Sequence, residues 1–294
     1  MDNNKSFFSS DRAHAILLPL IAIFCLALII GALFAYGMAT DTFGIRSDIF
    51  KKFNLKIDHP NKIAVIYVEG QMMADRSPDS PGSAFSSDIV KYMRLATEDP
   101  SYKAIVLRVN TPGGTPVAAE EIIDQMKKTQ TVKPIVISMG DMATSAGYYI
   151  SSQANRVVAN PDTFTGSIGV IWTFENKTKY YQDEGVNFYV AKSGNFKDMG
   201  SDKRNLTSGE MNYVQDIIND SYTRFVTNVA KGRNMSIDSV RQIADGRVYT
   251  GERAKELGLV DSLGGLYDAV DVAKNLSNVK GKVTIVYMNE PSIK

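Results

Sequence analysis

The chain has 294 residues, of which 44% are hydrophobic and 22% are charged, and its net charge at pH 7 is +1. This balance is typical of a globular protein with one large domain or two small ones, and it gives no indication of a nucleic acid or an acidic partner. Cys25 is the one cysteine, which excludes an intrachain disulfide and a cysteine metal cluster.

Residues 15–38 form an uncharged stretch that consists mostly of Leu, Ile, Ala and Phe. As a helix this stretch is about 36 Å long, which is enough to cross a hydrocarbon core of about 30 Å. The apolar region of a secretory signal peptide is shorter, about 7–15 residues. We therefore expect an uncleaved transmembrane anchor at 15–38, preceded by a tail at 1–14 and followed by a juxtamembrane linker at 39–61. Basic residues flank the anchor on both sides, so charge alone leaves its orientation undecided.

Strands and helices alternate from residue 62 onward, which predicts one α/β domain over residues 62–294. In its first half the predicted strands cover 63–68, 104–109 and 135–137, and the predicted helices 87–98 and 116–128. In its second half we expect a strand at 186–191, a long helix opened by the capping box Thr207–Glu210, a short helix within 233–246, a helix at 266–276 and a strand at 283–287.

Ser145 lies between small residues, where the strand 135–137 passes into a helix. At a helix N-terminus a serine hydroxyl meets free backbone N–H groups and the positive end of the helix dipole, which favour an oxyanion. The alternative is a serine that only caps the helix or packs in a tight turn. Gly113 and Gly114 follow the preceding strand, and because the carboxyl ends of parallel strands share one edge, we expect them to face Ser145. That loop is either an oxyanion hole or a plain turn.

A serine nucleophile needs a base, and the chain has two histidines, His14 and His59, both outside the α/β pattern. A Ser-His-Asp triad is therefore not expected, which leaves a carboxylate or a lysine. Burial can lower the pKa of a lysine from about 10.4 to near 7–8, where it can act as a base. The polar loop at 192–200 contains Lys192 and Lys197, and their spacing does not choose between them. No metal-ligand spacing or phosphate-binding loop occurs, so we expect neither a metal nor a cofactor.

Several motifs occur together in one order along the chain. They are Pro112–Gly114, Ala143–Ser151, Thr165–Gly169, Lys192–Gly194 with Lys197 and Asp198, and Asp245–Gly251. Over roughly residues 62 to 275 they resemble the signal peptide peptidase A family. The short form of that family also begins with one membrane helix.

The resemblance implies a serine endopeptidase with a Ser-Lys dyad, which degrades signal peptides that remain in the membrane after preprotein processing. The residues that it implies for the site are Ser145 as nucleophile, Lys197 as general base, Ser167 as the serine that orients this lysine, and the backbone of Gly113, Gly114 and Ala146 as the oxyanion hole. Where the family has glycines, this chain has Thr115 and Ala146, and a positive φ at an alanine would be strained.

The fold that the resemblance implies is a crotonase-like and Clp-protease-like superhelix of ββα units. It also implies a dome-like homo-oligomer such as an octamer, with Ser and Lys drawn from neighbouring subunits. The expected location is the cell membrane, spanned once, with the catalytic domain outside the cytoplasm.

Two other functions fit part of the pattern. A crotonase-type acyl-CoA enzyme also holds an oxyanion with paired backbone amides, although the loops that face Ser145 contain no dedicated acidic pair for water addition. A non-catalytic membrane scaffold would make the serine and the lysine irrelevant.

Overall fold

The computed structural model describes residues 24–33, 61–76 and 82–289. The chain divides into two compact units, Met1–His59 and Pro60–Lys294. Within the first unit, residues 24–33 are helical and their side chains are exposed. The rest of the predicted anchor at 15–38 lies outside the described residues, as do the tail and nearly all of the linker. Among the helices that the structure describes, none combines the length and the apolar character needed to cross a membrane.

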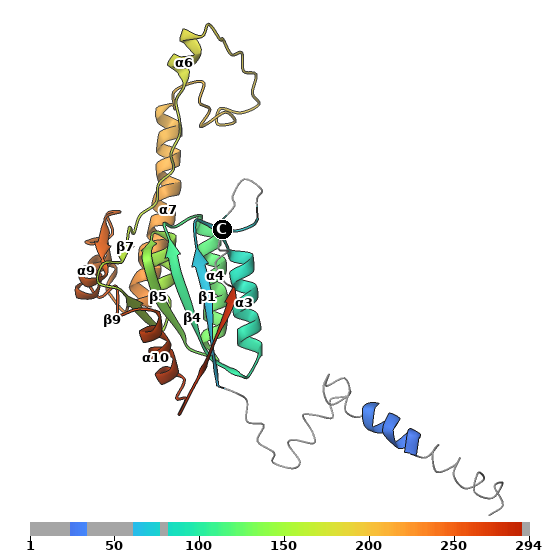
Figure 1. The fold of residues 1–294 in the computed structure, drawn as a ribbon. Coiled ribbons are helices and arrows are strands. Elements are labelled where there is room, and N and C mark those ends of the chain that lie inside the picture. The colour runs from blue at the N-terminus through green and yellow to red at the C-terminus, as the bar shows by residue number, and fades with distance from the viewer. Residues whose placement is uncertain (1–23, 34–60, 77–81, 290–294) are drawn as a thin grey trace, which may run out of the picture. The chain divides into compact units, whose positions relative to one another are not determined.

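The second unit is organised around one large β-sheet (Figure 1). Its strands are β1 (Lys62–Glu69), β4 (Tyr102–Thr111), β5 (Ile135–Thr144), β6 (Arg156–Ala159), β7 (Phe164–Gly166), β8 (Val248–Thr250), β9 (Ser262–Leu263) and β10 (Thr284–Asn289). In space they follow the order β10-β1-β4-β5-β6-β9, with β7 beside β5 and β8 beside β7. All of these pairings are parallel except β7 with β8. A separate pair, β2 (Met72–Met73) and β3 (Ala84–Phe85), lies before the first long helix.

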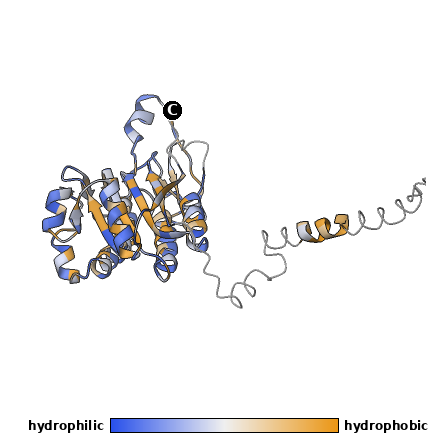
Figure 2. Ribbon diagram, turned by 60° about the horizontal axis from the view of Figure 1, so that its bottom comes forward, coloured by the Kyte–Doolittle hydropathy of each residue, from blue (hydrophilic) through white to orange (hydrophobic). Residues whose placement is uncertain are grey.

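Helices cover both faces of this sheet. The helices of this unit are α3 (Ser86–Glu98), α4 (Pro116–Gln130), α5 (Ala146–Ser151), α6 (Thr178–Asp183), α7 (Ser208–Gly232), α8 (Ile237–Arg241), α9 (Gly251–Glu256) and α10 (Leu266–Leu276), of which α6 lies away from the sheet (Figure 1). Successive strand residues point to opposite faces, so Ile66, Leu107 and Ile137 pack with α3, α4, α5 and α7. Their neighbours Val65 and Val106 pack with α10 on the other face. The central strands are accordingly apolar along most of their length (Figure 2).

The first half of the predicted domain is confirmed. The strands expected at 63–68, 104–109 and 135–137 appear as β1, β4 and β5, each longer than predicted. The helices expected at 87–98 and 116–128 appear as α3 and α4. Thr115 caps α4 as its sequence signature predicts, because its side chain accepts a hydrogen bond from the N–H of Ala118 at 3.3 Å.

The second half is confirmed in part. Both bonds of the capping box form between Thr207 and Glu210, and α10 has the predicted bounds. The short helix expected within 233–246 shrinks to α8. The strand predicted at 186–191 is wrong, because these residues are neither helix nor strand. Their apolar side chains, such as Tyr189, which is 97% exposed, pair with no neighbouring strand and face solvent instead.

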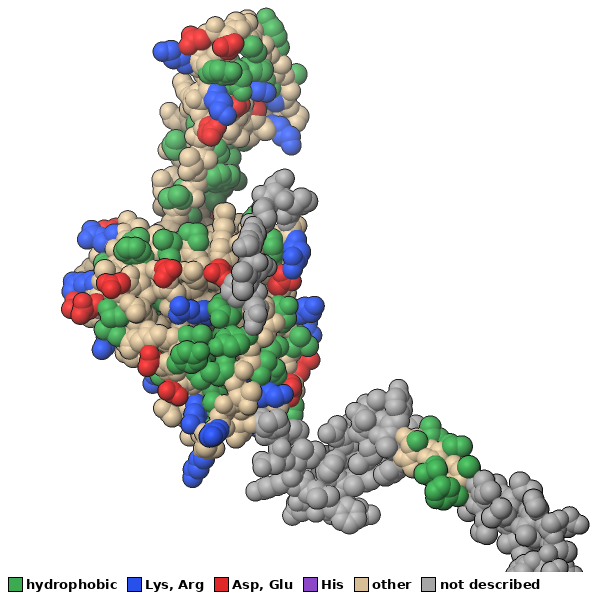
Figure 3. Space-filling view, in the orientation of Figure 1, with side chains coloured by type: hydrophobic (Ala, Val, Ile, Leu, Met, Phe, Trp, Pro, Cys, Tyr) green, Lys and Arg blue, Asp and Glu red, His purple; other side chains and the backbone are tan. Residues whose placement is uncertain are grey.

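Residues 171–207, which we call the distal segment, lie beside the N-terminal half of α7 and away from the sheet (Figure 1). The other half of α7 is packed into the sheet layer, where Phe225 and Val229 are buried. Apolar side chains gather on the surface of the distal segment and along α7 (Figure 3). The unit therefore consists of two parts. The body is the sheet with the helices packed on it, and the extension is the distal segment with the N-terminal half of α7.

Candidate active site

Ser145 stands at the junction of β5 and α5 in a strained backbone conformation. Its φ is 53° and its ψ is −119°, one of few positive-φ values outside glycine among the described residues. Such a conformation costs on the order of 1–3 kcal/mol, so it persists only where the surroundings impose it. Here the N–H of Ser145 donates to the carbonyl of Gly166 at 2.9 Å, and its carbonyl accepts from the N–H of Tyr149 at 2.8 Å. The sharp turn leaves Ser145 half-buried, and this residue lines a cleft.

The loop after β4 closes against this serine, as the sequence predicts. Thr111 pairs in register with Ala143, so the two strand ends meet at one edge of the sheet. Gly113 has a φ of +114°, and a Cβ there would lie 2.8 Å from the Cβ of Ser145. A Cβ on Gly114 would lie 1.9 Å from the carbonyl oxygen of Met72. Both positions therefore require glycine, for different reasons.

The backbone N–H groups near Ser145 differ in whether they already donate a hydrogen bond within the chain. The N–H of Gly113 donates to Thr111 Oγ1 at 3.1 Å, so it is occupied. The N–H groups of Gly114 and Ala146 have no partner among the described residues. Ala146 is an ordinary first residue of α5 without a positive φ, so an alanine causes no strain there. Two free donors, Gly114 and Ala146, thus flank the nucleophile candidate, which is the arrangement that an oxyanion hole needs.

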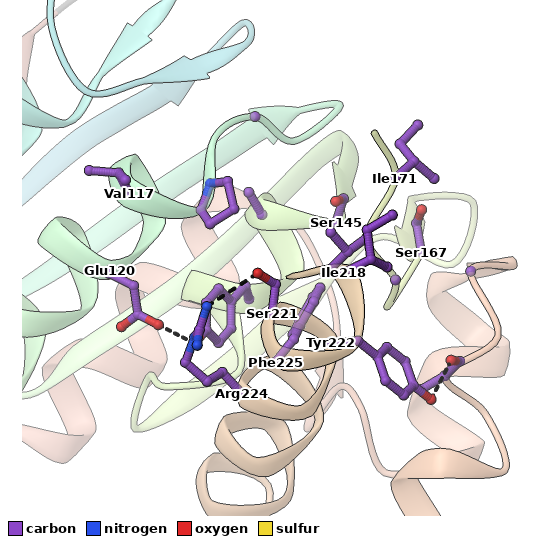
Figure 4. Close-up of a pocket in the computed structure, with 18 of the residues that line it drawn as sticks. Val117, Glu120, Ser145, Ser167, Ile171, Ile218, Ser221, Tyr222, Arg224 and Phe225 are labelled. Carbon is purple, nitrogen blue, oxygen red and sulfur yellow. Dashed lines mark hydrogen bonds between the residues drawn. The ribbon is translucent and has the colours of Figure 1, made fainter. Parts of the chain in front are cut away.

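A cleft of about 840 Å³ opens beside Ser145, and α4, α5 and α7 contribute its walls (Figure 4). Apolar side chains from all three helices line it, among them Val117 and Phe225. Ser167 lines it too, with a φ of 50° and its N–H donating to the carbonyl of Arg247 at 2.9 Å. The pairing of β7 with β5 brings Ser167 to the same edge as Ser145. Ser145 and Ser167 therefore both border the cleft.

The two candidate lysines lie in the distal segment, and neither lines the cleft in the part of the chain that the structure describes. The Nζ of Lys192 lies 2.7 Å from Asp198 Oδ1 and donates to the carbonyl of Asn195 at 3.1 Å. Lys197 is exposed and forms no ion pair with any described residue. Lys192 is therefore held in an ion pair, whereas Lys197 has no such partner among the described residues. One copy of the chain does not bring Ser145 and Lys197 together.

The carboxylates that line the cleft are bonded to neighbours: Glu121 accepts a hydrogen bond from the hydroxyl of Ser86, and Asp124 pairs with Lys127. Both histidines of the chain lie outside the described residues. Arg224 lines the cleft, but an arginine does not lose its proton in proteins. Asp245 is paired with Arg247, and Glu120 accepts a hydrogen bond from Tyr149.

Sequence reasoning missed a polar contact that joins the three helices of the cleft. The hydroxyl of Tyr149 on α5 donates to Glu120 Oε1 on α4 at 2.5 Å and accepts from the side-chain amide of Asn228 on α7. Burial raises the pKa of Tyr149, and the hydrogen bond to Glu120 adds to the effect. Tyr149 lies four residues after Ser145, so it shares a helix face with it, and this spacing could have indicated its place.

The chain matches known proteins over most of its length. The model of peptidase family S49 matches residues 127–280, and that of Clp protease matches residues 72–163. Protease 4 of Salmonella typhi is 36% identical over 88% of this chain and 42% of its own. An Enterococcus faecium protein named "Putative signal peptide peptidase SppA" is 39% identical over 67% of this chain and 58% of its own. The chain thus spans about half the length of these relatives.

A solved structure shares the fold. A mutant of the 1510-N membrane-bound stomatin-specific protease superposes with a TM-score of 0.52 at 15% identity, covering 79% of this chain and 99% of the other. The family match and the protease relatives support a peptidase over the scaffold and the acyl-CoA enzyme. The chain belongs to peptidase family S49 and is a serine endopeptidase.

Proposed function

We propose that this chain is a membrane-anchored endopeptidase with a Ser-Lys dyad, and that it degrades signal peptides and similar extended apolar peptides. The observation that carries the proposal is the turn at Ser145, which presents a hydroxyl between two free amides at an apolar cleft. The name of the Enterococcus relative supports the substrate class.

The reaction follows from the groups at this turn. Ser145 Oγ attacks the carbonyl carbon of the scissile peptide bond, and its proton passes to the neutral amine of Lys197. The negative charge on the carbonyl oxygen is held by the N–H groups of Gly114 and Ala146. The C–N bond breaks as the lysine gives its proton to the leaving amine. Water then cleaves the resulting ester, with Lys197 again as the base and Ser167 orienting its amine.

The base comes from a neighbouring copy of the chain in this proposal. Lys197 stands in the distal segment, and no lysine of the same copy lines the cleft among the described residues. A head-to-tail ring would bring the distal segment of one copy to the cleft of the next and would repeat this contact around a homo-oligomer. Exposed apolar side chains such as Ile171 and Tyr189, which are 89% and 97% exposed, would be covered in such a contact.

The anchor and the location complete the proposal. The uncharged stretch at 15–38 is long enough to span a bilayer once. An enzyme held there, with its catalytic domain outside the cytoplasm, works beside peptides that remain in the same membrane.

Subunit complementation tests the shared dyad. Ser145→Ala and Lys197→Ala are expressed separately and together in the full chain, and hydrolysis of a quenched fluorogenic peptide with alanine at the cleaved bond is measured. Each variant alone should be inactive. Co-expressed at equal amounts, they should recover about a quarter of wild-type activity, because that share of sites pairs an intact serine with an intact lysine.

The outcomes test separately whether Lys197 is the base and whether the dyad is shared between two copies. Turnover by Lys197→Ala alone would reject this lysine as the base. Two inactive variants that stay inactive in mixed oligomers would place both residues of the dyad in one copy. A Lys192→Ala variant serves as the matched control, and we expect it to remain active, because Lys192 is already bound to Asp198.

A further inference from the structure

Arg204 forms two forked ion pairs at the N-terminal end of α7. Its Nε and Nη2 donate to the carboxylate of Asp198 at 2.9 and 2.7 Å. Its Nη1 and Nη2 donate to the carboxylate of Glu210 at 2.9 and 2.6 Å. Asp198 directly follows Lys197, whereas Glu210 lies in the first turn of α7. One guanidinium therefore links the candidate base to the long helix.

The pairing is well shielded for a surface feature. The side chain of Glu210 is 3% exposed, that of Asp198 is 17% exposed and that of Arg204 is 29% exposed. Hydrogen bonds from Arg204 and from the backbone of Thr207 lower the pKa of Glu210 to about 2. Hydrogen bonds from Arg204 and then from Lys192 hold the pKa of Asp198 well below its ordinary range.

The residue on the other side of Lys197 is also attached to α7. The ring of Phe196 packs against that of Tyr213, with centroids 5.5 Å apart. Between the two attachments the chain forms a tight turn, in which the N–H of Lys197 donates to the carbonyl of Gly194 at 3.1 Å. Because both neighbours of Lys197 are fixed on one helix, the lysine itself is left exposed and its backbone position is set by α7.

We propose that Arg204 is a positioning residue for the reaction, which holds Lys197 in register with α7 so that its amine meets the serine of the next copy. This inference rests on the proposed function, because it takes Lys197 to be the base. Arg204 does not touch the reacting atoms.

The geometry requires an arginine. A guanidinium has five donors in a planar fork and can bind two carboxylates bidentately, whereas an ammonium makes single contacts without directional constraint. Asp198 also pairs with Lys192 through Oδ1. If Arg204 were absent, Lys192 alone would hold this carboxylate, and the second oxygen would be available to the amine of Lys197, where it would stabilise the protonated form that cannot act as a base.

The experiment compares Arg204→Gln, Arg204→Lys and Glu210→Gln in the full-length oligomer. Arg233→Gln is the matched control, because Arg233 also makes a bidentate pair, with Asp261 at 3.0 Å, but lies in the body. We expect each Arg204 variant to lower kcat on the order of 10²-fold with little change in KM, since misplacing a catalytic group by about 1 Å has an effect of this size. Glu210→Gln should lower kcat in the same direction, and Arg204→Gln with Glu210→Gln should be no worse than Arg204→Gln alone.

Two readouts distinguish positioning from simple loss of structure. The rise of kcat/KM with pH should move to higher pH in Arg204→Gln, and ethylguanidinium should restore part of kcat in Arg204→Ala but none in Lys197→Ala. Wild-type kcat and pH profile in Arg204→Gln, with Lys197→Ala inactive, would overturn this inference and leave the dyad intact. An active Lys197→Ala would instead overturn the proposed function. If Arg233→Gln lowers kcat as much as Arg204→Gln, the effect is general destabilisation and the inference fails.

Discussion

Ser145 and Lys197 lie in parts of the molecule that are built differently. The body holds Ser145 with backbone hydrogen bonds at the edge of a buried sheet, where Gly113 and Gly114 approach too closely for any side chain. In the distal segment, Lys197 is positioned through its two neighbours. Asp198 forms an ion pair with Arg204, and Phe196 packs on a ring of α7. The difference teaches that Ser145 is positioned by the backbone of one copy, whereas the position of Lys197 depends on ion pairs and ring contacts of its neighbours; under the proposed function, the base would be the more easily displaced of the two groups.

The largest effect is expected from removing either reacting group. Ser145→Ala and Lys197→Ala should each lower kcat on the order of 10⁴-fold or more, since members of a catalytic dyad act as a unit. An acylating inhibitor should label Ser145 in the wild type and label neither variant to a comparable extent, because one variant lacks the hydroxyl and the other lacks the base that activates it. Mass spectrometry of the labelled chain and steady-state kinetics measure both effects. Normal turnover by Ser145→Ala would contradict the assignment of the nucleophile.

The next effect tests the rigidity of the body. Gly114→Ala places a Cβ 1.9 Å from the carbonyl oxygen of Met72, so the loop must shift and carry its free amide away from the nucleophile. We expect kcat to fall about 10²-fold to 10³-fold, as for loss of one oxyanion donor. Gly209→Ala is the control, because nothing lies within 4 Å of its added methyl. Equal kcat values for the two variants would show that the Gly114 amide plays no part.

A smaller effect is expected at the contact that joins α4, α5 and α7. Tyr149→Phe removes the hydroxyl that bridges Glu120 and Asn228 and leaves their polar groups without this partner. We expect the free energy of unfolding to fall by about 1–3 kcal/mol. Tyr180→Phe, at a tyrosine that is 61% exposed, should change it little. Urea denaturation followed by far-UV circular dichroism measures both, and equal stability of the two variants would contradict a structural role for the Tyr149 hydroxyl.

The smallest effect is confined to the distal segment and depends on pH. Asp198 and Glu210 have pKa values in the folded state below their ordinary values, so their contribution to stability is complete above about pH 5 and is lost as the pH falls towards 2. Trp172 is the one tryptophan of the chain and packs against Phe174, which in turn lies against Gly200. Its fluorescence should therefore report local loosening in acid.

Comparison with Arg204→Gln makes this test specific. The variant should already show the acid-type fluorescence at pH 7, while circular dichroism of the body stays unchanged. A tryptophan signal that is identical in both proteins at every pH would show that the ion pairs do not order the segment.

The structure of the body could be predicted from the sequence better than that of the distal segment, for a physical reason. Buried strands such as 63–68 and 104–109 are apolar because helices cover both faces of the sheet, so their apolar pattern predicts strands directly. The strand predicted at 186–191 has the same apolar character, but its side chains are exposed and no strand pairs with it. Local composition cannot show whether a partner surface exists within the same copy.

The candidate site also contains features that could be predicted from the sequence and features that could not. The turn at Ser145 and the glycine loop could be predicted, because both follow strands that end at one edge. Spacing did not distinguish Lys192 from Lys197, and the feature in which the two differ, an ion pair between Lys192 and Asp198, depends on the fold. The occupied amide of Gly113 was equally invisible in the sequence.

The helix α7 has 25 residues and is about 38 Å long at 1.5 Å per residue. Its buried end is fixed in the sheet layer near Phe225, and its other end carries the turn of Lys197 through Arg204. In the proposed assembly, the length of this helix would therefore set how far one copy reaches towards the next. Inserting one helical turn would displace Lys197 by about 5.4 Å relative to the body of its own copy, and under the proposal it would disconnect this lysine from the serine of the neighbouring copy.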